Sequence, residues 1–135
     1  MLDADHNNPG NLERAYKKDG TPLLFEGETD QNNDKVFRKF INVQYGYRAL
    51  MEQLNIYFAR DKNKINEIIS IFAPISANNP TQKYIDNISN WTGLQPNKKY
   101  QPDAEIIIKL AAAISRQENG QPAIISDVVA GYHLL

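Results

Sequence analysis

From residue 44 onward, apolar side chains recur at three- and four-residue spacing in four successive segments, and this pattern constrains the fold most. Such spacing places apolar groups on one face of an α-helix. It predicts helices over about residues 44–59, 64–73, 80–92 and 103–118, with a short terminal helix within 123–135. Apolar stripes of this kind must be covered by one another, so the sequence predicts a mainly helical body with one core.

Proline and glycine mark the ends of these segments. Pro74 follows the second predicted helix, and Asn79 with Pro80 is typical of a helix start with proline in the first turn. Gly93 and Gly120 follow the third and fourth predicted helices, where glycine accepts the left-handed conformation that closes a helix. These breaks support the helix boundaries independently of the apolar spacing.

The first third of the chain has a different character, being rich in Asn, Asp, Gly and Pro. The run Asn-Asn-Pro-Gly-Asn at residues 7–11 indicates a turn. Residues 21–26 and 35–40 are typical of short strands, joined by an acidic, Asn-rich stretch. The sequence therefore predicts a β-hairpin over about residues 22–40. The fold class expected for residues 1–135 is a single domain, α+β and mainly α, with this small β-hairpin.

Composition excludes several kinds of site. The chain contains no cysteine, which rules out disulfides, thiolate zinc sites and a cysteine nucleophile. Histidine occurs only at His6 and His133, so no histidine-rich metal site and no cofactor is expected. No apolar run reaches the length of a transmembrane segment, and the first five residues lack the basic and apolar regions of a signal peptide.

Charge is distributed unevenly along the chain. Residues 35–100 carry ten basic and four acidic side chains, whereas the segments on either side are acidic. A basic middle can meet an anionic polymer such as cell wall or nucleic acid. An ordinary mixed surface explains the pattern better than a nucleic-acid site, so no nucleic-acid partner is expected.

Glu118 is the carboxylate whose position best suits acid catalysis. Glycoside hydrolysis needs one carboxylic acid to protonate the leaving oxygen, and usually a second carboxylate or a positioned water on the other face. Glu118 comes four residues after Ile114, at the edge of the apolar face and in the last turn of its predicted helix. Burial and the negative end of the helix dipole there both favour the protonated form. The alternative interpretation is a partly exposed glutamate that only precedes a glycine cap.

Candidates for the second carboxylate lie earlier in the chain. Glu26, Glu28 and Asp30 fall on the predicted hairpin, where a solvated acidic turn is the alternative interpretation. Glu13 is a further candidate, and a surface ion pair with Arg14 would also explain it.

Three side chains are candidates for binding sugar hydroxyl and amide groups. These are Asn8, Asn11 and Tyr84. The alternative roles are turn formation for the two asparagines and core packing for Tyr84.

The ordered motifs of the chain resemble a family of phage and prophage structural (virion) proteins. The resemblance covers most of the sequence and rests on residues 7–11, 37–40, 45–50, 68–74, 79–85 and 113–120. It implies a phage-associated protein and says little about chemistry.

A second resemblance is to cell-wall glucosaminidases of the flagellar-muramidase type, which have a lysozyme-like fold. Residues 8–13 resemble the Asn-rich turn of that family, 24–40 its acidic hairpin, 37–57 its aromatic entry and helix, and 79–85 its tyrosine helix. The family's glutamate helix should precede the turn, but here residues 111–120 resemble it at the far end of the chain. We interpret this order as a circular permutation, which is physically easy where chain ends lie close together.

The second resemblance implies a function and a set of partners. It places Glu118 as the general acid and Glu26 or Glu28 as the hairpin carboxylate. It also requires the two chain ends to lie close together, with the turn at residues 8–11 following Glu118 in space. The implied activity is that of a muramidase- or glucosaminidase-like peptidoglycan hydrolase of a phage or interbacterial toxin system, either virion-associated or delivered to the bacterial periplasm. The implied partners are peptidoglycan and either an immunity protein or a virion or secretion apparatus. A non-catalytic virion or wall-binding module is the alternative.

Overall fold

The computed structural model of the chain describes residues 4–73 and 80–135. Within them, the 3-10 helix η1 (Ala4–His6) precedes the strands β1 (Ala15–Tyr16) and β2 (Pro22–Leu23), which pair in an antiparallel hairpin. The α-helices follow as α1 (Val43–Ala59), α2 (Ile65–Phe72), α3 (Thr81–Thr92), α4 (Ala104–Asn119) and α5 (Ile125–His133). The expected fold class, α+β and mainly α with a small hairpin, is confirmed.

Local side-chain chemistry sets several helix boundaries. Asn42 caps α1 by accepting a hydrogen bond from the Tyr45 backbone N–H at 3.0 Å, and Asp103 caps α4 in the same way. Gly93 and Gly120 close α3 and α4 with φ angles of 74° and 73°, as predicted. Pro74 and Asn79, which the sequence places at helix boundaries, lie outside the described residues.

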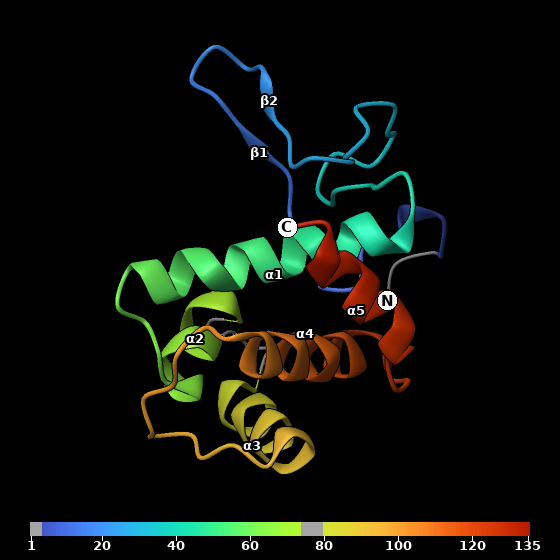
Figure 1. Cartoon of the computed structure of the whole chain (residues 1–135). Coiled ribbons are helices and arrows are strands. Elements are labelled where there is room, and N and C mark those ends of the chain that lie inside the picture. Colours follow the sequence, from blue (N-terminus) through green and yellow to red (C-terminus); the bar gives the residue numbers. More distant parts are fainter. Residues whose placement is uncertain (1–3, 74–79) are drawn as a thin grey trace.

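Helix α4 lies at the centre of the packing, against α1, α3 and α5, and Figure 1 shows α1 and α4 stacked across the body. Both helices bury the apolar stripes that the sequence predicted. Among the fully buried side chains are Leu50, Met51, Leu54, Ile107, Leu110 and Ile114. Among the described residues, no helix combines the length and the apolar character needed to cross a bilayer.

The hairpin lies earlier in the chain than predicted. Ala15 pairs with Leu23 and Tyr16 with Pro22, so the hairpin spans residues 15–23 instead of 22–40. The turn between the strands is closed by a hydrogen bond from the Gly20 N–H to the Lys17 carbonyl at 3.0 Å, and Gly20 has a φ of 88°. Glycine is suited to this left-handed position in a short hairpin loop.

Residues 35–40 make single bridges where a strand was predicted. Phe37 bridges Glu13, and Phe40 bridges Glu28, so this segment pairs with two different partners. Just before it, Asp34 accepts hydrogen bonds from the backbone N–H groups of residues 36 and 37. A side chain that satisfies backbone donors in this way competes with a continuous strand ladder.

Candidate active site

Glu118 lies in the last turn of α4, where its half-buried carboxylate accepts two hydrogen bonds. The Asn11 side-chain amide donates to Oε1 and the Tyr84 hydroxyl donates to Oε2, each at 2.9 Å. These three groups come from a turn near the N-terminus, from α3 and from α4. The predicted proximity of Asn11 to Glu118 is confirmed.

The turn that carries Asn11 is fastened to the end of α4. The Asn119 side-chain amide donates to the Pro9 carbonyl at 2.9 Å, one residue away from Glu118 along the helix. Asn11 itself has a φ of 49°, a left-handed conformation that asparagine tolerates better than most residues. Residues distant in sequence are thereby held together at one end of α4.

Tyr84 is a buried hydrogen-bond donor to this carboxylate. Its side chain is 3% exposed, and its ring packs edge-on against Phe72. Burial, followed by the negative charge and hydrogen bond of Glu118, raises the pKa of the Tyr84 phenol far above its ordinary value. The phenol therefore stays protonated and keeps its hydrogen available to Glu118.

A cleft of about 640 Å³ opens beside Glu118. Aromatic and apolar side chains share its walls with a few polar groups, which is typical of small-ligand sites. Its lining consists of Gly10, Asn11, Leu12, Glu13, Phe25, Phe37, Arg38, Gln53, Tyr57, Ile71, Phe72, Ala73 and Glu118.

The two hairpin carboxylates expected to face Glu118 do not line this cleft. The Glu28 side chain is 1% exposed and pairs with Arg38. The Glu26 side chain is 64% exposed and pairs with Arg48 of α1 at 3.0 Å. The expectation for both residues rested on a hairpin over 22–40, and the shift of the hairpin to 15–23 leaves them engaged by arginines.

Glu13 is the acidic side chain that lines the cleft together with Glu118. The ion pair with Arg14 that was the alternative interpretation of Glu13 is not formed, and Arg14 pairs with Asp30 at 3.1 Å instead. Among the described residues, none forms a hydrogen bond or ion pair with the Glu13 carboxylate. Asp30, whose side chain is 60% exposed, also lies outside the cleft lining.

Asn8 has a different place from the one expected of a sugar-binding residue. It is 6% exposed and does not line the cleft. Its amide nitrogen donates to the carbonyls of Leu12 and Arg38, and its carbonyl oxygen accepts from the Leu12 N–H. These bonds commit the Asn8 side chain to shaping the turn that presents Asn11.

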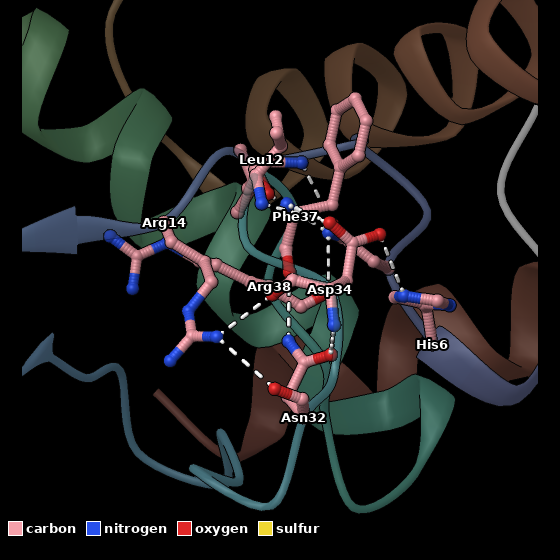
Figure 2. A network of polar contacts seen from close by, with 9 residues as sticks. His6, Leu12, Arg14, Asn32, Asp34, Phe37 and Arg38 are labelled. Carbon is pink, nitrogen blue, oxygen red and sulfur yellow. Dashed lines mark hydrogen bonds and ion pairs between the residues drawn. The ribbon is translucent and has the colours of Figure 1, made fainter.

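A polar network behind the cleft fixes the segment that carries Phe37 and Arg38 (Figure 2). Asp34 accepts from the Val36 and Phe37 N–H groups and contacts His6 Nε2 at 3.1 Å. These backbone hydrogen bonds are the main cause that lowers the pKa of Asp34. Arg14 donates to the Asp34 carbonyl at 2.8 Å, which ties the same segment to the chain leading into β1.

Several cleft residues were missed by reasoning from the sequence. Arg38 is 7% exposed, and its guanidinium lies 4.6 Å from the centre of the Phe25 ring. It also donates to the carbonyls of Glu13 and Leu23, so it joins both ends of the hairpin to the cleft wall. The available signal was an arginine between two phenylalanines, at 37 and 40, just after an acidic, Asn-rich stretch.

The described residues show no cluster of three or more His, Cys, Asp or Glu side chains arranged to hold a metal ion. The polar groups that line the cleft are carboxylates, amides, the Tyr57 hydroxyl and the Arg38 guanidinium. A carboxylate with fixed hydrogen-bond donors can exchange a proton with a bound molecule, and a second, unpaired carboxylate can act on that molecule from another wall.

Comparison with known proteins gives one distant relationship to a phage protein. No family model matches the sequence. The chain is 27% identical over 128 residues to "Protein P5" of Pseudoalteromonas phage PM2, a match that covers 94% of this chain and 77% of that protein. This similarity is consistent with a phage-associated protein.

Proposed function

We propose that this chain is a peptidoglycan glycan-strand hydrolase, muramidase- or glucosaminidase-like, that serves a phage or an interbacterial toxin system. The observation that supports this most is the Glu118 carboxylate, held by Asn11 and Tyr84 at the edge of a 640 Å³ cleft. The resemblance of the sequence to cell-wall glucosaminidases and its similarity to a phage protein agree with this proposal.

The groups around Glu118 suit both protonation states of a general acid. The Asn11 amide nitrogen can only donate, so it holds Oε1 whether or not the carboxyl is ionised. The Tyr84 hydroxyl both donates and accepts, so it donates to an ionised Oε2 and accepts from a protonated one. In the proposed reaction the Glu118 proton passes to the glycosidic oxygen, and the bond to the anomeric carbon breaks with its electron pair going to that oxygen.

We assign the second carboxylate to Glu13. It shares the cleft with Glu118, and no described residue occupies its oxygens, whereas Glu26 and Glu28 are paired with arginines. In this position Glu13 would stabilise the positive charge that develops on the sugar ring, or take a proton from the attacking water. Water then adds its oxygen to the anomeric carbon; its proton goes either directly to Glu118 or to Glu13, and in the second case Glu13 releases that proton to solvent and Glu118 takes one up from solvent as the cycle closes.

The test is the release of reducing ends from purified peptidoglycan. Glu118→Gln preserves size and hydrogen bonding but cannot supply the proton, so the rate should fall by roughly 10²–10⁴-fold. Glu13→Gln should also reduce the rate strongly. Glu26→Gln is the matched control, because Glu26 lies on the surface against Arg48, and its rate should equal that of the wild type.

Two results would contradict parts of the proposal. Equal rates for Glu118→Gln and the wild-type protein would remove Glu118 from the mechanism. If the wild-type protein released no reducing ends from any purified wall, the non-catalytic virion or wall-binding module would become the better interpretation.

A further inference from the structure

The hairpin presents two distinct faces. Residues directly opposite one another in an antiparallel pair lie on the same face, so Ala15 and Leu23 share one face while Tyr16 and Pro22 share the other. The Arg14 guanidinium lies 5.4 Å from the Tyr16 ring centre, as the two-residue period requires for side chains on one face. Arg14 therefore contacts the second face, on which Tyr16 is still 47% exposed.

The first face continues the wall of the cleft. Two residues before Ala15 lies Glu13, and two residues after Leu23 lies Phe25, and both line the cleft beside Glu118. In the other direction the same period leads to Lys17, whose N–H donates to the Thr21 carbonyl across the hairpin at 2.8 Å. We name the surface of Ala15, Lys17 and Leu23 the hairpin's cleft-side face.

This face carries apolar surface that the fold leaves uncovered. Leu23 is 45% exposed, and Figure 1 shows the hairpin projecting away from the helical body. An exposed leucine across from a small alanine offers an apolar surface, and the exposed Lys17, two residues beyond Ala15, brings a positive charge to this end of the hairpin. An occupant of this face therefore needs both apolar patches and negative charges.

We propose that the cleft-side face binds peptidoglycan as the polymer leaves the cleft, with sugar rings against Leu23 and a stem-peptide carboxylate near Lys17. This inference rests on the proposed function in so far as that function names the polymer. The face continues directly from Glu13 and Phe25, and a polymer that fills the cleft must extend beyond it. The Lys17 charge complements the carboxylates of an anionic wall polymer.

The test is cosedimentation with purified peptidoglycan sacculi, in a Glu118→Gln background so that the polymer stays intact. Leu23→Asp and Lys17→Glu should each weaken binding about fivefold or more. The matched controls are Leu24→Asp and Lys18→Glu, which make the same changes at the next residues of the hairpin. Leu24 is 47% exposed, close to the 45% of Leu23, and follows it directly at the end of β2, where the two-residue period puts it on the other face. Both controls should leave binding within about twofold.

The salt dependence of binding provides a second readout. The Lys17 contribution should shrink as ionic strength rises, because salt screens exposed charges, whereas the effect of Leu23→Asp should persist. Lys17 lies at the exposed hairpin tip, so Lys17→Glu tests the inference even if Leu23→Asp disturbs the hairpin.

The outcomes separate this inference from the proposed hydrolase. Equal losses of binding for each variant and its matched control would overturn the inference. The hydrolase proposal would be unaffected by that result if the wild-type protein still cleaved the wall. Face-selective loss of binding in a protein that cleaves no wall would support the inference and refute only the hydrolase.

Discussion

At the scale of single residues, the contact between Tyr84 and Glu118 makes a prediction about stability at alkaline pH. Burial and the Glu118 carboxylate raise the pKa of Tyr84 above its unfolded value of about 10. A group whose folded pKa is raised stabilises the fold fully below its unfolded pKa and loses that contribution as pH rises beyond it. The free energy of unfolding should therefore fall as pH increases from about 9 to 11.

The measurement is urea unfolding of the wild-type protein and Tyr84→Phe at several pH values in this range. Phenylalanine cannot ionise, so the variant should lose less of its free energy of unfolding with rising pH. Tyr47 and Tyr57 also have raised pKa values and supply part of the slope in both proteins. Identical slopes for the two proteins would show that Tyr84 does not sit in the environment described here.

The proximity of Glu118 and Asn11 could be predicted from the sequence, whereas the choice among Glu13, Glu26 and Glu28 as the partner carboxylate could not. Glu118 is marked by its place in a well-defined helix, and the family resemblance links it to the Asn-rich turn. The role of Asn8 depends on which backbone groups come within reach of its amide, and that is set by tertiary packing. Glu13 became the better candidate only when the arginine partners of Glu26 and Glu28 were known.

At the scale of elements, the segment from 24 to 40 depends on a buried ion pair. Arg38 and Glu28 have side chains that are 8% and 1% exposed, and Glu28 also accepts from the Phe25 N–H at 3.0 Å. Removing one member of a buried pair leaves the other charge without compensation. Glu28→Gln should therefore lower the free energy of unfolding by about 3 kcal/mol.

The control for this prediction is Glu26→Gln, which removes an ion pair whose glutamate is 64% exposed. Exposed pairs contribute little, so the free energy of unfolding should change by less than about 1 kcal/mol. Chemical unfolding followed by circular dichroism measures both variants. A Glu28→Gln protein as stable as Glu26→Gln would show that the pair with Arg38 does not hold this segment.

The elements also show where reasoning from sequence succeeds and fails. The helices follow from a three- to four-residue period sustained over eight residues or more, and caps such as Asn42 and Gly120 reinforce it. The strands have two residues each, too short for a two-residue period to identify. The Asp19-Gly20 pair was the available signal for the turn between these strands. The prediction instead paired the longer apolar segments at 21–26 and 35–40, which placed the hairpin too late in the chain.

At the scale of the whole molecule, the segment before the hairpin is part of the helical body although it lies far from α4 in sequence. Its residues contact α4 through Asn11 and Pro9, and α1 through Asn7. This is the spatial arrangement that the proposed circular permutation requires, because the Asn-rich turn must follow the glutamate helix in space.

The close approach of this segment to α1 predicts the effect of Gly46→Ala. In an ordinary helix this change stabilises by roughly 0.5–1 kcal/mol, because alanine loses less conformational freedom than glycine. Here a Cβ at residue 46 would come within 1.9 Å of the Asn7 carbonyl oxygen and 2.7 Å of the Pro9 ring. The obstacle is backbone, which cannot rotate away as a flexible side chain would.

Overpacking of this kind costs about 1–3 kcal/mol or more, which exceeds the gain in helix propensity. Gly46→Ala should therefore lower the free energy of unfolding by about 1–2 kcal/mol in urea titrations. Because displacement of Asn7 would also move the turn that carries Asn11, the proposed hydrolysis of peptidoglycan should fall even at temperatures where the variant is folded. A stabilised Gly46→Ala protein would mean that the N-terminal segment does not pack against α1, and Asn11 would then lack the support that places it on Glu118.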